Sequence, residues 1–296
     1  MKRTADRGMK TAILGICVNL GLAVIKCSAG VLGQSFALVA DGLESIADVF
    51  SGVVVYAGLK IAEKPPDHNH PYGHGKAEPV AALVVSLALM VAAFGIIYEG
   101  IREITAPNGA PKSYTLVVLA GVLIIKEMLF RHVVSVGETI GSSAVKSDAW
   151  HHRSDALTSA FAFAGISIAL LGGPGWEAAD GWAAVGAALV ILYTAWKQLR
   201  PALLELSDVA PPQQIGTQIR EVAKSVPGIL GLDKCLVRKM GFSFYVDLHI
   251  IVDGELSVRE GHLLSHEVED EIRRALPDVA KVLIHVEPQE ELNCEN

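Results

Sequence analysis

Charged residues are scarce in this chain. Only 19% of its 296 residues are Asp, Glu, Lys or Arg, whereas 51% are hydrophobic, and the mean hydropathy is +0.40. Soluble proteins rarely have this composition, which is typical of a polytopic membrane protein with a modest soluble part. A basic excess is also lacking, because the net charge is −7. Nucleic acid is therefore not expected as a partner.

Three sequence signals are missing as well. The chain has only four cysteines and no CxxC spacing, so no disulfide framework is indicated. It contains no HExxH, and its His-rich motifs supply no spare general base, which argues against a metal-dependent hydrolase, so we do not expect an enzyme. The basic residues 1–10 precede a long apolar run without a small-residue cleavage site, which predicts a retained transmembrane helix instead of a signal peptide.

Long apolar runs dominate the first two thirds of the chain. Runs of about 20 residues or more can cross a hydrocarbon core of about 30 Å. They predict six transmembrane helices, at about 12–32, 36–61, 80–104, 115–136, 145–171 and 182–200. Basic residues gather at the N-terminus, after the second span and at the end of the sixth. The positive-inside rule then predicts that both termini are cytoplasmic. We expect a multi-pass protein of the cell (inner or plasma) membrane.

The last segment has a different composition. From Asp208 onward, 16 Asp and Glu stand against 9 Lys and Arg, while the first 207 residues have equal numbers of acids and bases. Its patterns predict a helix at 213–225, strands at 231–239 and 243–252, a helix at 257–275 opened by a capping box, and a strand at 281–286. We expect a six-helix transport domain at 1–207 and, at 208–296, an α+β cytoplasmic domain of order αββαβ, with its helices on one face of the sheet.

Acidic and imidazole residues interrupt the second and fifth spans. Glu44 and Asp48 are four residues apart, as are His151 and Asp155, so each pair lies on one helix face. Ionisable groups inside a membrane are costly and by default mark an ion pathway. The second span has no Lys or Arg before Lys60 to balance its acids. A bound cation is therefore the favoured counter-charge, and four such ligands suit a divalent transition metal.

Other interpretations of these stripes stay open. The polar residues could instead form contacts or a buried salt bridge between helices. Asp148 and His152 form a second pair four residues apart in the fifth span and could replace His151 and Asp155 as ligands. Asp41 shares the stripe of the second span, where it lines an access route or has a plain structural role.

Two further clusters lie outside the spans. The loop KPPDHNHPYGHGKAE holds Asp67, His68, His70 and His74 within eight residues. Such a loop can wrap one metal, but it could also be a weak capture site or a proton relay. In the last segment, His285 and Glu287 are two residues apart on a strand and share a face. Other residues of that segment, dispersed in sequence, extend the candidate metal site: Asp233, His249, His262 and His266.

The ExxxD of the second span, the HNHPYGHGKAE loop and the HHRSD of the fifth span together resemble the cation diffusion facilitator family. The resemblance covers about Thr11 to Glu287. It implies a six-helix metal-ion/proton antiporter that works as a homodimer with a metallochaperone-like cytoplasmic domain. It also implies three sets of metal ligands: Glu44, Asp48, His151 and Asp155 in the membrane; Asp67, His70 and His74 in the loop; and Asp233, His249, His262, His285 and Glu287 in the cytoplasmic domain.

We therefore expect proton-coupled export of a divalent transition metal from the cytoplasm, with Zn²⁺ as the first candidate. Divalent ions are expected both as substrate and as regulators bound by the cytoplasmic domain. Glu44 departs from the family, where His or Asp is common at this position. Three carboxylates and one imidazole form a harder ligand set, so Mn²⁺, Fe²⁺ and Co²⁺ stand beside Zn²⁺ and Cd²⁺. The alternative is a membrane-bound metal sensor that signals through its cytoplasmic domain without transport.

Overall fold

The computed structural model describes residues 2–107, 109–140 and 143–289. The chain forms two compact units. The first consists of Met1–Val55 and Val84–Leu199, and the second consists of Tyr56–Leu83 and Arg200–Asn296.

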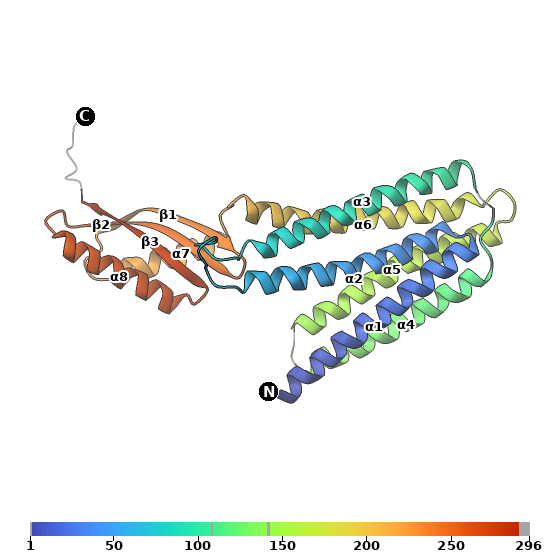
Figure 1. The fold of residues 1–296 in the computed structure, drawn as a ribbon, viewed down its shortest axis with the longest axis horizontal. Coiled ribbons are helices and arrows are strands. Elements are labelled where there is room, and N and C mark those ends of the chain that lie inside the picture. Colours follow the sequence, from blue (N-terminus) through green and yellow to red (C-terminus); the bar gives the residue numbers. More distant parts are fainter. Residues whose placement is uncertain (1, 108, 141–142, 290–296) are drawn as a thin grey trace. The chain divides into compact units, whose positions relative to one another are not determined.

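Six long helices make up the first unit and run in part into the second. They are α1 (Lys2–Gly33), α2 (Phe36–Ala62), α3 (Ala77–Thr105), α4 (Tyr114–Ile140), α5 (Ser143–Leu171) and α6 (Ala178–Leu206) (Figure 1). The six predicted helices are thus present, and each extends past its predicted bounds at one end or both. The helical fold class is confirmed.

Four of the helices are long and apolar enough to cross a membrane: α2, α3, α6 and the part of α1 from Leu14 to Gly33. Among the described residues, α4 and α5 do not meet the same criterion. The sequence of α4 includes Lys126, Glu127 and Arg131, and the apolar part of α5 is Asp155–Leu171. That α4 and α5 also cross the membrane stays a prediction.

Small residues allow the helices of the first unit to pack closely. Half of its main buried cluster is alanine, drawn from α2, α3, α5 and α6. A Cβ atom built at Gly165 of α5 would lie 2.2 Å from the Cβ of Ala183 in α6. Gly100 of α3 and Gly181 of α6 likewise face each other across a close contact. Such small-residue contacts are how helices associate where lipid removes the hydrophobic driving force.

Asp180, in the first turn of α6, fixes the start of α2. Its Oδ2 accepts hydrogen bonds from the backbone N–H groups of Phe36 (2.5 Å) and Ala37 (3.2 Å), and its Oδ1 accepts one from Ser35 Oγ (2.7 Å). The first N–H groups of a helix have no partner within the helix, and a carboxylate there also complements the helix dipole. The buried aspartate therefore anchors the helix that carries Glu44 and Asp48.

Asp180→Ala is expected to destabilise the protein by about 1–2 kcal/mol, because three buried donors lose their acceptor. Ser35→Ala should have a smaller effect, since the carboxylate still accepts from the two backbone groups. Thermal unfolding of the detergent-solubilised protein measures both variants. Equal midpoints for Asp180→Ala and the native protein would show that this cap contributes nothing.

The second unit contains a small α+β fold. Its elements are α7 (Gln213–Ser225), β1 (Gly231–Met240), β2 (Ser243–Val252), α8 (Val258–Ala275) and β3 (Val279–Pro288) (Figure 1). The predicted order αββαβ is confirmed. The predicted capping box is present too: Ser257 Oγ accepts from the backbone N–H of Glu260, and the Glu260 side chain accepts from the backbone N–H of Ser257.

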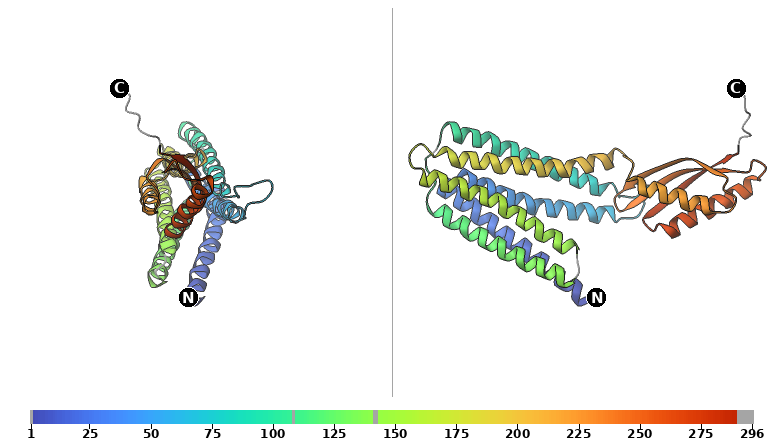
Figure 2. Two further views of the ribbon diagram at one scale, coloured as in Figure 1. Left: turned by 90° about the vertical axis from the view of Figure 1, so that its left-hand side faces the viewer. Right: turned by 180° about the vertical axis from the view of Figure 1, so that it is seen from behind.

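The sheet has the order β1-β2-β3, with β1 antiparallel and β3 parallel to β2. Alternate residues of the central strand, Val246, Leu248, Ile250 and Val252, are buried in one cluster with residues of α7 and α8. Both helices therefore cover one face of the sheet, as predicted (Figure 2). Because side chains alternate along a strand, His249 of β2 belongs to the opposite, open face.

Candidate metal sites

Three of the four predicted transport ligands have described side chains, which come from α2 and α5. Asp155 is 5% exposed, and the Oε2 atom of Glu44 is buried with no hydrogen-bond partner among the described side chains. The carboxyl group of Glu44 interacts electrostatically with the carboxyl groups of Asp48 and Asp155. The structure thus gathers a buried aspartate and two partly buried acids from two helices into one cluster, whose oxygens suit a divalent cation.

The side chain of His151, the fourth predicted ligand, lies outside the described residues. The same is true of Asp148 and His152. All three residues belong to α5, in which His151 precedes Asp155 by about one turn. His151 therefore stays a predicted ligand, and the alternative pair Asp148 and His152 stays open.

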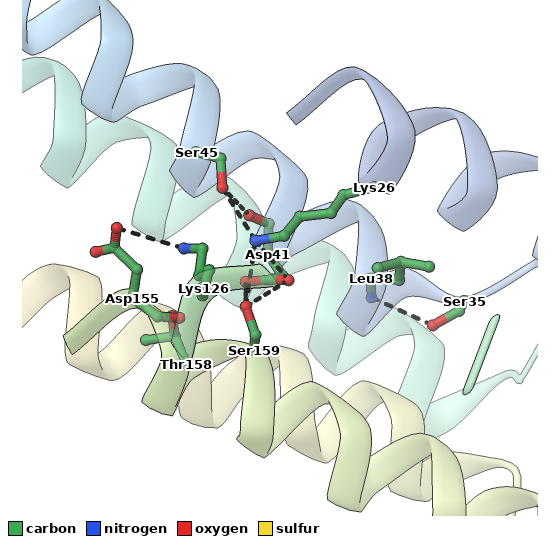
Figure 3. Close-up of polar contacts among 9 residues, drawn as sticks. All are labelled: Lys26, Ser35, Leu38, Asp41, Ser45, Lys126, Asp155, Thr158 and Ser159. Carbon is green, nitrogen blue, oxygen red and sulfur yellow. Dashed lines mark hydrogen bonds and ion pairs between the residues drawn. The ribbon is translucent and has the colours of Figure 1, made fainter. Parts of the chain in front are cut away.

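A buried lysine, Lys26 of α1, neutralises Asp41. Its Nζ lies 2.8 Å from Asp41 Oδ2 and donates to Ser45 Oγ (3.0 Å) and Ser159 Oγ (3.2 Å) (Figure 3). Ser159 in turn donates to the Asp41 carboxylate at 2.8 Å. This network joins α1, α2 and α5 and satisfies the ammonium group with three partners. It favours a structural role for Asp41.

A second buried lysine, Lys126 of α4, lies beside a predicted metal ligand. Its Nζ is 3.3 Å from Asp155 Oδ2 (Figure 3). The alternative of a buried salt bridge between helices is therefore present beside the predicted ligands. The prediction of a bound cation as counter-charge considered charges within the second span, whereas α1 and α4 each bring a lysine to the acids of α2 and α5. A lysine inside an apolar run was itself a sequence signal, because such residues usually face a partner in the bundle.

The buried cluster is still negative overall. The Lys26 ammonium group offsets Asp41. The three ligand carboxylates, Glu44, Asp48 and Asp155, stand against the single ammonium group of Lys126, which leaves a formal charge of −2 among the described residues. One divalent cation would neutralise it. Buried charge of one sign is costly unless it is paired.

The loop between α2 and α3 brings together three of its predicted ligands. Asp67 Oδ2 lies 3.3 Å from His74 Nε2, and Asp67 Oδ1 lies 3.4 Å from His70 Nδ1. The backbone N–H groups of His70 and Asn69 donate to Asp67 and lower the pKa of its carboxyl. Ligand atoms of the three side chains all lie within 4.8 Å of one another. His68 is not part of this group.

This loop contacts the β1–β2 turn within the second unit. The Tyr245 hydroxyl donates to the backbone oxygen of Tyr72 at 2.9 Å. The backbones of Gly75 and Gly241 also meet closely, and Gly241 has a φ of +61°. An ion pair of 2.9 Å between Lys76 and Asp208 lies in the same unit. The loop ligands are therefore held by the fold of the C-terminal part of the chain.

Gly75→Ala is expected to push the loop away from the β1–β2 turn. A Cβ atom there would lie 2.7 Å from the backbone oxygen of Met240, and neither backbone can yield cheaply. Overpacking of this kind typically costs about 1–3 kcal/mol. The N–H of Gly241, which donates to Glu205 at 2.9 Å, should then exchange its hydrogen faster in native-state exchange measurements.

Gly216→Ala in α7 is the matched control, because nothing lies within 4 Å of its Cβ position. Alanine also favours a helix over glycine. Equal protection of the Gly241 amide in both variants would mean that the close contact at Gly75 does not hold the loop.

A third group of ligands lies on the sheet of the second unit. The parallel register of β2 and β3 pairs His249 with His285 and Ile251 with Glu287. His249 Nδ1 lies 2.6 Å from Glu287 Oε1, and His285 Nε2 lies 3.9 Å from the same oxygen. The ligand atoms of these three side chains lie within 4.8 Å of one another, as in the loop group, so they could hold an ion.

The structure does not bring the other two predicted cytoplasmic ligands to this group. Asp233 is about half exposed and lies 3.7 Å from the neighbouring Lys234. His262 lies on α8, where its ring contacts that of His266 with centroids 4.6 Å apart. Their assignment as ligands stays a prediction.

Comparisons with known proteins agree with this architecture. Residues 12–207 match the family described as the cation efflux transmembrane domain, and residues 211–289 match the cation efflux protein cytoplasmic domain. Together with the apolar helices, these matches identify a membrane-embedded cation transporter. The chain belongs to the cation efflux family, the cation diffusion facilitators, as the resemblance of its motifs implied.

Individual relatives cover nearly the whole chain. It is 30% identical over 283 residues to the manganese efflux system protein MneP of Bacillus subtilis, which covers 94% of this chain and 95% of the relative. It is 29% identical over 272 residues to the magnetosome protein MamB of a Magnetospira species, with 92% of each chain covered. A solved structure of the MamM CTD is 23% identical, covers 26% of this chain and 98% of that one, and has a TM-score of 0.26.

Proposed function

We propose that this protein exports a divalent transition-metal cation from the cytoplasm in exchange for protons. The observation that carries the proposal is the acidic cluster of α2 and α5, which has a net formal charge of −2 with Lys126 included. One buried Glu44 oxygen of this cluster has no hydrogen-bond partner among the described side chains. Acidic residues within apolar membrane helices are costly and by default mark an ion pathway.

In the proposed cycle the metal binds Glu44, Asp48, Asp155 and unprotonated His151 from the cytoplasmic side. Alternating access of the helix bundle then exposes the ion to the opposite side. Protonation of His151 there, and of a carboxylate, lowers the affinity, because metal ligands must be deprotonated. Protons thus supply the release step.

The range of candidate substrates follows from the ligand chemistry. Imidazole suits Zn²⁺, with Cd²⁺ beside it, whereas three carboxylates make a harder site that also suits Mn²⁺, Fe²⁺ and Co²⁺. Zn²⁺ is the first candidate from the sequence, and the name of MneP as a manganese efflux system supports Mn²⁺ beside it.

The two other ligand groups are proposed as regulatory metal sites. An ion at Asp67, His70 and His74 would strengthen the loop that contacts the β1–β2 turn. An ion at His249, His285 and Glu287 would lower the negative charge of the cytoplasmic domain and let two protomers approach. We propose a homodimer in the cell membrane, with a division near residue 207 and both termini cytoplasmic.

The proposal is tested with the purified protein in proteoliposomes under an imposed pH gradient. Zn²⁺, Mn²⁺, Fe²⁺, Co²⁺ and Cd²⁺ are offered separately, and uptake should follow the gradient and stop when an ionophore collapses it. Metal binding without gradient-driven flux would favour the membrane-bound sensor instead.

A further inference from the structure

The position of Lys126 bears on how the transport site releases its ion. The Lys126 and Asp155 side chains are 2% and 6% exposed, and the ammonium nitrogen is 3.3 Å from a carboxylate oxygen proposed to bind the metal. A cation bound to that oxygen and an ammonium group in contact with it would repel each other. The metal ion and the Lys126 ammonium group therefore compete for the Asp155 carboxylate, and each weakens the binding of the other.

Lys26 is a buried lysine of the same helix bundle whose contacts indicate a structural role. Its ammonium group has three short contacts, to Asp41, Ser45 and Ser159, and none of these residues is a proposed ligand. Among the described side chains, by contrast, Asp155 supplies the one ion-pair partner of Lys126 (Figure 3). A lysine has a flexible four-carbon stem and a compact charge, so it can leave one partner without disturbing the backbone.

We propose that Lys126 is a built-in counter-ion of the transport site, which the incoming divalent cation displaces from Asp155. The inference rests on the proposed function, since it concerns the same site. In the empty site the ammonium group pairs with Asp155 and limits its burial cost. In the loaded site the metal takes its place on the carboxylate, and the cluster becomes neutral at formal charge. After release, Lys126 returns and competes against rebinding.

The inference predicts opposite effects for two substitutions. Lys126→Gln removes the competing charge, so the KM for flux should fall about tenfold while the maximal rate also falls, because release is slowed. Lys126→Arg keeps the positive charge, but its planar guanidinium group can donate two hydrogen bonds to the Asp155 carboxylate. The arginine should leave less readily, so the KM should rise about tenfold.

Both variants are measured in proteoliposomes with Zn²⁺ and Mn²⁺, beside Lys26→Gln as the matched buried control. Lys26→Gln should change the KM far less than Lys126→Gln does, because Lys26 touches no proposed ligand. An unchanged or raised KM in Lys126→Gln, or an equal change in Lys26→Gln, would overturn the displacement. If Lys126→Gln does not fold, Lys126→Arg carries the test, and an unchanged or lowered KM overturns the inference.

A second readout does not depend on turnover. The ion should raise the thermal midpoint of Lys126→Gln more than that of the native protein, because the substitution makes binding tighter and leaves Asp155 without its lysine. An equal or smaller rise contradicts the inference.

Failure of this inference is distinct from failure of the proposed function. If the native protein transports the metal, Asp155→Asn does not, and both Lys126 variants keep the native KM, only the counter-ion role is wrong. If the native protein shows no flux, or if Asp155→Asn transports as well as the native protein, the assignment of the transport site is wrong.

Discussion

Replacement of Asp155 by asparagine is expected to lower metal flux at least about a hundredfold. The substitution keeps the size of the side chain and a carbonyl oxygen for Lys126, but it removes the negative charge that the metal requires. Even substitutions beside metal ligands typically cost about 10–100-fold in affinity, and the loss of a charged ligand should cost more. Initial rates of Zn²⁺ and Mn²⁺ uptake under a fixed pH gradient measure the effect.

The matched control is Asp180→Asn, which alters another buried aspartate of the same unit. Its asparagine oxygen can still accept from the start of α2, and the residue is far from any proposed ligand role. Its flux should stay near the native level with an unchanged KM. If Asp155→Asn transports as well as this control, Asp155 does not bind the substrate.

The second large effect is expected at Glu44, where histidine should change the order of preferred ions. Glu44→His converts three carboxylates and one imidazole into two of each, a set that favours Zn²⁺ over Mn²⁺. One buried oxygen of Glu44 has no hydrogen-bond partner in the described part of the chain, and the carboxyl group interacts with Asp48 and Asp155, which indicates that its side chain faces the site. The ratio of Zn²⁺ to Mn²⁺ flux should rise by about tenfold.

Glu63→His provides the same chemical change just beyond the end of α2, at an exposed residue. It should leave the ratio unchanged. A ratio equally unchanged in Glu44→His would place Glu44 outside the ion's first set of ligands and reopen the assignment of the second-helix pair.

Patterns within one element could be predicted from the sequence. The helix from Gln213 to Ser225 and the strand from Ser243 to Val252 match the predicted bounds. Their signals are local, since alternation and capping depend on residues a few positions apart. The shared face of His285 and Glu287 follows from the same rule.

Contacts between elements could not be predicted in this way. The pairing of His249 with Glu287 depends on the parallel register of β2 and β3, which no local pattern sets. The lysines show the same limit. Lys26 and Lys126 are separated by many residues from Asp41 and Asp155 in the chain, and only helix packing places them together. The sequence of one span therefore does not reveal the positive charge that neighbouring helices bring to its acids.

The central claim is that a metal ion binds between α2 and α5 on its way through the membrane. It is tested most directly by anomalous diffraction from crystals of the full-length protein soaked with Zn²⁺ or Mn²⁺. We expect an anomalous peak within about 2.0–2.2 Å of oxygens from Glu44, Asp48 and Asp155 and of a nitrogen from His151. Peaks confined to the loop and cytoplasmic groups, with Lys126 still on Asp155, would contradict it.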